Sequence, residues 1–302
     1  MATTQDGGDK ENHDSDGISP IMEKFRQDGY IVLKQVIPSD LVEAFRVHAE
    51  NVFRDVFGTL HRQGHTPFPV HFHDDTYTLE LGVKNGFREV VMRSPGRYEL
   101  SLLLNQDEQH QNVLRKGLYQ RLLDALVSVG PQLMGETSWD NVHVCNLSLV
   151  VSTPGTAEQS WHADGGHVNV KEHEPSHVAN IFIPLSNITM EMGPTQVRPG
   201  SHFYTRNLAP LLLAAKARKA LRPPTAPLLT RGDTLAFDYR ILHRGLANTT
   251  ADTTRTILVL TVAKKWFRDR LNFPSRSIYD LAEAQLEPSS KPFPNSGASS
   301  AD

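Results

Sequence analysis

The pattern of strands in the second half of the chain constrains its fold more than any other feature. After about residue 140, short runs rich in β-branched and aromatic residues alternate with turns that contain glycine and proline. These runs are VHVCNLSLVVS, HVANIFIPLSN, TQVRPG, DTLAFDY and RTILVLTVAK, with one helical insert expected over residues 208–221. Short strands that follow one another in this way are typical of an antiparallel sandwich or barrel.

The first half of the chain is helical by contrast. Pro20 begins a helix that Gly29 ends, and a strand follows over residues 30–36. Apolar residues at helical spacing return over residues 38–57 and 112–130. We therefore expect a mainly β fold with flanking helices, in which a helical layer covers one face of the strands.

The two ends of the chain are polar and offer little to bury. Residues 1–18 and 286–302 are predicted to be disordered, which leaves residues 19–285 as a single domain. No repeat or linker interrupts that domain.

Composition excludes several classes of function. The formal net charge of −3 argues against a general nucleic-acid-binding protein, which is usually basic. No segment approaches the roughly 18 apolar residues of a membrane span, and the acidic N-terminus is unlike a secretory signal. The single cysteine, Cys145, excludes a disulfide within the chain. We expect a cytoplasmic protein that acts on a small molecule, with neither nucleic acid nor membrane as a partner. Nothing in the sequence indicates its oligomeric state.

Three residues are candidate metal ligands. His162 and Asp164, in QSWHADGGH, project to the same side if this segment is extended. His243, which lies just past an apolar strand in FDYRILHRG, is the best candidate for a third ligand. Two imidazoles and one carboxylate on a triangular face leave three coordination positions open, which suits Fe(II) that must bind both a co-substrate and O₂. A structural zinc site would instead be closed by a fourth protein ligand.

Arg255 is a candidate anion-binding residue. It opens the apolar run RTILVLTV, twelve residues after His243, and a buried guanidinium there needs an acidic partner. Its planar fork matches a carboxylate, either that of a ligand or that of an acid such as Asp252.

Taken together, these features resemble a known family. The order His162-x-Asp164, His243, Arg255 is similar to that of the phytanoyl-CoA dioxygenase family of iron- and 2-oxoglutarate-dependent oxygenases. Three longer stretches carry the same resemblance over residues 21–270: FRQDGYIVLKQVIPSDLVEAFR, EMGPTQVRPGSH and RGDTLAFDYRILHRGLANTTADTTRTILVLTV. The resemblance implies a double-stranded β-helix, also called a jelly roll.

The resemblance also implies roles for individual residues. The metal ligands would be His162, Asp164 and His243, and Arg255 would hold the distal carboxylate of 2-oxoglutarate. Gln159 and Thr195 match positions that contact the co-substrate in some members. Relatives that halogenate their substrates lack the carboxylate ligand, so the presence of Asp164 argues against halogenation.

Further features concern the pocket itself. Asn146 is a polar residue on an otherwise apolar strand and is expected to face the co-substrate. Arg198 and Met192 depart from the family pattern around the PGSH turn, and either the pocket or only the surface could change as a result. The irregular region 61–99 is a candidate lid over the barrel mouth. Substrate-contact candidates, most of them from this region, are Phe72, Tyr77, Phe87, Arg93 and, beside the metal ligands, His167.

Alternatives remain open at this point. His71 and His73 have a spacing that could hold a metal, but no downstream partners match them and prolines interrupt their strand. The favoured function is a dioxygenase that releases succinate and CO₂ while it hydroxylates, desaturates, cyclises or epoxidises a small organic molecule. The two alternative functions are those of a non-catalytic jelly roll that binds a metal or a small acid, and of a cupin-type metalloenzyme that uses no 2-oxoglutarate.

Overall fold

The structure of the protein, a computed structural model, describes residues 20–62, 81–102, 113–207, 213, 219–268 and 272–279. The predicted disordered ends, residues 1–18 and 286–302, lie outside the described residues, as does most of the predicted insert at 208–221.

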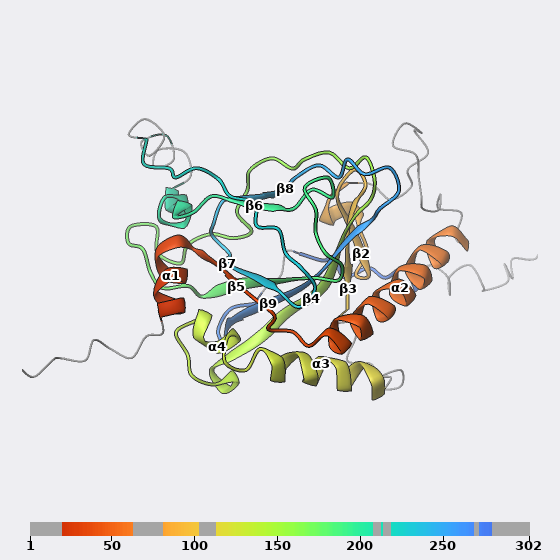
Figure 1. Cartoon of the computed structure of the whole chain (residues 1–302), viewed down its shortest axis with the longest axis horizontal. Helices are drawn as coiled ribbons and strands as arrows, with labels where there is room; N and C mark the ends of the chain where they lie inside the picture. The colour runs from red at the N-terminus through yellow and green to blue at the C-terminus, as the bar shows by residue number, and fades with distance from the viewer. Residues whose placement is uncertain are drawn as a thin grey trace, which may run out of the picture.

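Two antiparallel sheets form the body of the protein (Figure 1). The larger sheet has the strand order β1-β7-β5-β9-β4-β3-β2, and the smaller sheet pairs β6 with β8. The strands in chain order are β1 (Tyr30–Leu33), β2 (Val90–Ser94), β3 (Arg97–Ser101), β4 (Val142–Ser152), β5 (Val178–Pro184), β6 (Thr195–Val197), β7 (Thr234–Asp238), β8 (His243–Gly245) and β9 (Arg255–Lys264). The smaller sheet lies on the opposite side of the larger sheet from helices α2 and α3 (Figure 1), and the whole is the expected jelly roll.

Four α-helices and four short 3-10 turns have both of their bounds within the described residues. The helices are α1 (Pro20–Asp28), α2 (Ser39–Arg62), α3 (Val113–Ala125) and α4 (Gly130–Leu133). The 3-10 turns are η1 (Val83–Asn85), η3 (Trp139–Asn141), η4 (Ser201–Phe203) and η5 (Thr205–Asn207).

Strand β4 shows why one face of the larger sheet packs on helices while the other forms a polar cavity. Successive side chains of a strand point to opposite faces. Leu147, Leu149 and Val151 therefore share one face, where they join the main hydrophobic core with the apolar side chains of α2 and α3. The alternate positions include Asn146 and Ser152, which are buried on the other face. Burial of the first face stabilises the fold, and the second face is left free for chemistry.

Most of the predicted elements are confirmed, and two predictions are wrong. Strands β4 and β9 have the predicted bounds. The region 61–99, which was expected to be irregular, includes most of the hairpin β2–β3, which turns at Pro95-Gly96 and extends the edge of the larger sheet. Residues 63–80 lie outside the described residues, so the role of this region as a lid stays a prediction. The predicted helix over 112–130 ends at Ala125. Gly130 begins α4 instead, and only glycine fits there, because a side chain would collide with the ring of Trp139.

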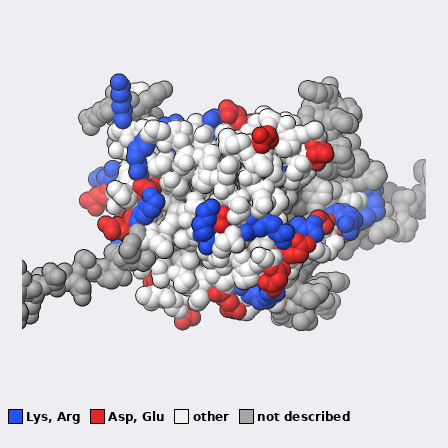
Figure 2. Space-filling model, viewed as in Figure 1, with Lys and Arg blue, Asp and Glu red and all other residues white. Residues whose placement is uncertain are grey.

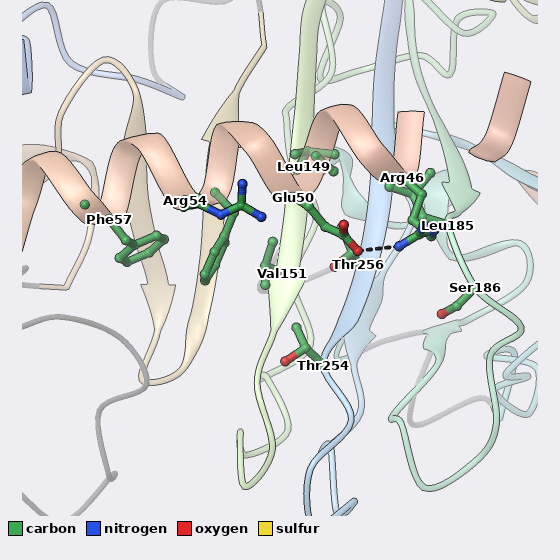
Figure 3. A pocket seen from close by; sticks show the side chains of 13 residues that line it. Arg46, Glu50, Arg54, Phe57, Leu149, Val151, Leu185, Ser186, Thr254 and Thr256 are labelled. Atoms are coloured by element: carbon green, nitrogen blue, oxygen red, sulfur yellow. Dashed lines mark hydrogen bonds and ion pairs between the residues drawn. The ribbon is translucent and has the colours of Figure 1, made fainter. Parts of the chain in front are cut away.

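An apolar cavity of about 650 Å³ lies between α2 and the core-facing side of the larger sheet (Figure 3). Phe53, Phe57, Leu149 and Val151 line it, together with Arg46 and other residues. Arg46 forms ion pairs with Glu43 and Glu50, so its charge is already compensated (Figure 3). This cavity is more apolar than the one described below, and it holds none of the candidate metal ligands.

The surface agrees with the near-neutral composition. Basic and acidic side chains are interspersed on the face seen in Figure 2, with no broad basic area. Among the described helices, none is both long enough and apolar enough to cross a bilayer.

Candidate metal centre and co-substrate pocket

The backbone places two of the candidate ligands directly opposite each other. His162 and His243 form an antiparallel bridge, in which each amide nitrogen donates to the carbonyl of the other residue at 3.1 and 2.9 Å. Their ring centroids are 4.4 Å apart. His162 lies on an extended segment outside the named strands, and His243 begins β8. Two positions 81 residues apart in the sequence are therefore neighbours because their backbones pair.

Asp164 reaches the same point two residues further along this segment. Its amide nitrogen donates to the carbonyl of Tyr239 at 3.0 Å, and that of Gly165 donates to the same oxygen at 3.2 Å. A Cβ atom at Gly165 would lie 2.3 Å from the Tyr239 ring, so only glycine permits this approach. A glycine at this position thus allows the backbone of the ligand segment to pack against Tyr239.

The side chains of the three residues converge as metal ligands do. One nitrogen or oxygen from each lies within 4.8 Å of the others, and no other such group of His, Cys, Asp or Glu occurs among the described residues. Nε2 of His243 lies 3.5 Å from Oδ2 of Asp164, and Nε2 of His162 lies 3.8 Å from Oδ1. A divalent metal accepts such a set of two imidazoles and one carboxylate.

The imidazole tautomers also suit metal binding. Nδ1 of His162 is 2.8 Å from the carbonyl of Ser160, and Nδ1 of His243 is 3.2 Å from that of Ile241. A proton on each Nδ1 leaves each Nε2 lone pair free for a metal. Burial lowers the pKa of His243 from its usual 6.5, and the neighbouring His162 lowers it further, although Asp164 opposes the shift. The imidazole is therefore neutral near pH 7, as metal ligation requires.

A row of residues across β3, β4 and β9 forms a buried cationic site in the same cavity. Arg97 pairs with Ser152 in the strand register, and Ser152 pairs with Arg255. The hydroxyl of Ser152 accepts from both guanidinium groups, from Nε of Arg97 at 2.9 Å and from Nη2 of Arg255 at 2.8 Å. Each arginine is only 1% exposed.

The charge of this row is uncompensated. In the part of the chain that the structure describes, no ion pair joins Arg97 or Arg255 to a carboxylate, so the alternative of a salt bridge to Asp252 is wrong. Nε and Nη1 of Arg255 are buried and have no hydrogen-bond partner among these residues. Burial, together with the charge of Arg97, lowers the pKa of Arg255 to about 9, and burial lowers that of Arg97 to about 10. Two buried cations and two unpaired N–H groups form a site for an anion.

The metal ligands and the two arginines of the row, Arg97 and Arg255, line one cavity of about 570 Å³. This volume is within the range of small-molecule sites. His243 on β8 and Arg255 on β9 belong to different sheets, and both line this cavity.

Other predicted site residues lie in the same cavity. Gln159, Thr195, Asn146 and Arg93 all line it. The side-chain oxygen of Gln159 accepts from the amide of Gly245 at 3.0 Å, which ties the ligand segment to β8. Asn146 donates to Glu99 at 3.2 Å, and Nε of Arg93 donates to Glu99 at 2.6 Å. Asn146 and Arg93 are therefore members of one polar wall.

Two predicted residues lie elsewhere. Phe87 is 5% exposed within the main core, with the guanidinium of Arg276 over its ring, and it does not line the cavity. His167 also lies outside the cavity lining, because its Nε2 bonds to the hydroxyl of Thr205 at 2.9 Å and its ring packs against His173. Phe72, Tyr77, His71 and His73 lie outside the described residues.

The two departures from the family pattern do not reach the cavity. The guanidinium of Arg198 lies 4.9 Å from the ring centroid of Trp161. Met192 is buried in a separate small core. Neither side chain lines the pocket.

The sequence reasoning missed several lining residues, among them Arg97, Glu99, Asn180 and Tyr239. A usable signal existed for Asn180, because it interrupts the apolar run VANIFIP as Asn146 interrupts VHVCNLSLVV. Arg97 gave no such signal, because the hairpin that carries it was not predicted.

A jelly roll that carries two histidines and a carboxylate on one open face belongs to the class of mononuclear non-haem metal proteins. Comparison with known proteins narrows the class. The model of the phytanoyl-CoA dioxygenase family matches residues 25–257, and the chain belongs to that family.

Individual relatives share only a small part of the sequence with this chain. "Dioxygenase easH" of Epichloe festucae var. lolii is 33% identical over 118 residues, which are 38% of this chain and 60% of that protein. The first three curated relatives are matched over 60%, 36% and 51% of their own lengths. AviO1 from Streptomyces viridochromogenes Tue57 has the same fold, with a TM-score of 0.56, 21% identity and coverage of 86% of this chain and 100% of that one. HygX from Streptomyces hygroscopicus, solved with nickel and 2-oxoglutarate bound, gives a TM-score of 0.52 at 14% identity, with coverage of 82% and 87%.

Proposed function

We propose that the protein is an Fe(II)- and 2-oxoglutarate-dependent dioxygenase that oxidises a small organic molecule. One observation carries the proposal: the His162, Asp164 and His243 ligand atoms share a cavity with the unpaired nitrogens of Arg255. A metal site with open positions and a buried anion site are the two things that chelation of a keto diacid requires. Family membership and the 2-oxoglutarate bound in HygX agree with this assignment.

The residues present fit the metal and its co-substrate. His162, Asp164 and His243 would hold the iron, and Arg255 would hold the distal carboxylate of 2-oxoglutarate. When bound, iron supplies the coupled chemistry in which 2-oxoglutarate and O₂ give succinate and CO₂ as one oxygen atom goes to the substrate. Desaturation, cyclisation or epoxidation are the other outcomes that this class of chemistry allows.

The contribution of the chain is to bind and to orient. Arg97 adds a second positive charge beside Arg255, and Ser152 fixes both guanidinium groups through one hydroxyl. A ligand with a carboxylate at this end relieves the unfavourable burial of charge, so binding and orientation are coupled. Gln159 and Thr195 stand at the β8 side of the cavity, where we propose that they also contact the co-substrate.

The remaining wall of the cavity is the proposed substrate side. Arg93, Glu99 and Asn146 form a hydrogen-bonded group there, and Tyr239 and Asn272 line the cavity as well. This lining favours a small organic molecule with polar groups. We further propose that residues 19–285 act as one domain and that the protein is cytoplasmic.

An anaerobic titration tests the assignment. Fe(II) followed by 2-oxoglutarate should give a weak visible metal-to-ligand charge-transfer band, and air should then yield succinate. His162→Ala and Asp164→Ala should abolish both signals. Metal binding with no band and no succinate would favour a cupin-type enzyme or a non-catalytic metal-binding protein instead. A screen of small molecules, scored by succinate release, would then identify the substrate.

A further inference from the structure

We infer that Asn180 and Thr261 are positioning residues of the metal centre, which hold the carboxylate of Asp164 in one orientation beside the two histidines. The inference rests on the proposed function, because it concerns how that metal is held. Neither residue is among the ligands or the co-substrate contacts proposed above.

Two hydrogen bonds connect the interior of the larger sheet to the ligand. The side-chain amide of Asn180 donates to Oδ2 of Asp164 at 2.7 Å. The hydroxyl of Thr261 donates to Oδ1 of Asn180 at 2.6 Å. Asn180 is 4% and Thr261 1% exposed, whereas the side chain of Asp164 is 25% exposed. The chain of bonds therefore runs from two fixed, buried groups to a more accessible one.

The sheet fixes the two positioning residues. Asn180 on β5 lies directly opposite Thr261 on β9, and both strands are central in the larger sheet. On its other side Asn180 pairs with Phe237 of β7. Buried residues on paired central strands lose little further freedom when they bond to each other. Their hydrogen-bonding groups are thus in place before any metal binds.

The direction of the bonds specifies which way the amide faces. The Thr261 hydroxyl donates to the carbonyl oxygen of the Asn180 amide, so the NH₂ group points at Asp164. If the amide were turned over, its oxygen would face the carboxylate, which is an acceptor only when ionised. That arrangement would replace a charge-assisted hydrogen bond with a repulsion. A hydroxyl can either donate or accept, so it is the carboxylate of Asp164 that selects this amide orientation. Thr261 then holds Asn180 in that orientation, and Asn180 holds the carboxylate of Asp164.

Asp164 needs this support more than the histidines do. Each histidine ring bonds through Nδ1 to the backbone carbonyl two residues before it. For the carboxylate of Asp164, the bond from Asn180 plays the corresponding part, and it comes from a different element of the fold. Groups that orient metal ligands in this way typically change metal affinity roughly 10- to 100-fold when they are removed.

Binding of Co(II), titrated by its visible absorption in the absence of 2-oxoglutarate, tests the inference. Asn180→Leu keeps the shape of the side chain and removes the donor, so the Kd for Co(II) should rise roughly 10- to 100-fold. Thr261→Val should raise the Kd by a smaller factor, because the amide can still donate, and Thr261→Ser should restore wild-type affinity. Thr256→Val, the same change on the opposite, core-facing side of β9, is the matched control and should leave the Kd unchanged.

Urea unfolding of each metal-free variant separates positioning from stability. Wild-type affinity in folded Asn180→Leu would overturn the inference, as would equal affinities of the Val and Ser variants at Thr261. If Asn180→Leu does not fold, the Thr261 pair decides the question. Failure of the proposed function gives a different result, in which Asp164→Ala binds Co(II) as tightly as the wild type.

Discussion

Replacement of Arg255 by methionine should make the metal-free protein more stable and at the same time weaken 2-oxoglutarate binding. The two effects share one cause. Arg255 is fully buried, its Nε and Nη1 have no partner among the described residues, and Arg97 places a second positive charge beside it. Methionine removes the charge and fills a similar volume with apolar atoms.

The size of the stability effect follows from the cost of burying the charge. Burial and Arg97 lower the pKa of Arg255 far below its usual value, to about 9. At about 1.4 kcal/mol for each pKa unit, this corresponds to roughly 5 kcal/mol that disfavours the charged form. Replacement of buried ionic groups by apolar ones in other proteins is neutral or stabilises by about 1–4 kcal/mol. We therefore expect the free energy of unfolding to rise by about 1–4 kcal/mol.

The binding effect has the opposite sign. Two charge-assisted hydrogen bonds to a carboxylate contribute roughly 1.5–3 kcal/mol each. Arg97 stays in place and retains part of the attraction, so we expect a loss of about 3 kcal/mol in binding free energy. This loss is roughly a 100-fold rise in the Kd for 2-oxoglutarate.

Urea unfolding with EDTA present measures the first effect, and the charge-transfer titration measures the second. Arg276→Met is the matched control, because Arg276 donates to the carbonyl of Gly86 at the surface of the core, far from the cavity lining. The control should leave 2-oxoglutarate affinity unchanged and should not raise stability. A less stable Arg255→Met protein would refute the idea of an uncompensated charge, and unchanged affinity would remove Arg255 from its role.

Three further outcomes are expected. In Gly165→Ala the added methyl group collides with the Tyr239 ring. The change should therefore lower the free energy of unfolding by about 1–3 kcal/mol and weaken Co(II) binding by about tenfold or more. A wild-type Kd for Co(II) would contradict this packing argument. Phe87→Leu should lower the free energy of unfolding by about 1–2 kcal/mol, since the ring packs in the core. It should leave the rate of succinate formation per folded enzyme unchanged. A large change in that rate would indicate that Phe87 contacts the substrate after all. Burial lowers the pKa of His173 to about 4, so the unfolded chain binds more protons than the folded one between pH 6.5 and 4, and stability falls as the pH falls through that range. This change in pKa corresponds to roughly 3 kcal/mol for a fully buried group, but His173 is only half-buried and solvent screens its charge, so we expect His173→Phe to remove about 1 kcal/mol of the fall. Urea unfolding at several pH values measures the effect, and an unchanged pH dependence would contradict the role of His173.

Strands could be predicted from the sequence where their burial leaves a regular run of apolar residues. Strands β4 and β9 were predicted with their bounds because each is a long apolar run that ends in polar residues. The hairpin β2–β3 was not predicted, because Arg97 and Glu99 interrupt its pattern. Both side chains line the cavity, so the signal of a buried strand was lost where the strand carries polar groups of the pocket.

The same limit applies to the candidate site. His162, Asp164, His243 and Arg255 could be proposed from the sequence because their spacing resembles that of a family. The polar interruption of VANIFIP was a signal for Asn180 as a pocket residue, but its contact with Asp164 was not predictable, because that contact depends on how β5 faces the loop that precedes it. Whether a polar residue such as His167 reaches the cavity depends on the path of an irregular segment, which periodicity does not describe.

The bridge between His162 and His243 has a consequence for the chain as a whole. These ligands are 81 residues apart in the sequence, and two backbone hydrogen bonds join them in the fold. An unfolded chain would have to close a loop of that length to gather the ligands, at a large cost in chain entropy. Metal would therefore bind the native barrel almost exclusively, and a free concentration 100 times its Kd would stabilise the native state by about 2.7 kcal/mol. The iron supply of the cell would then set how long each molecule survives unfolding and proteolysis, as well as how many molecules are active.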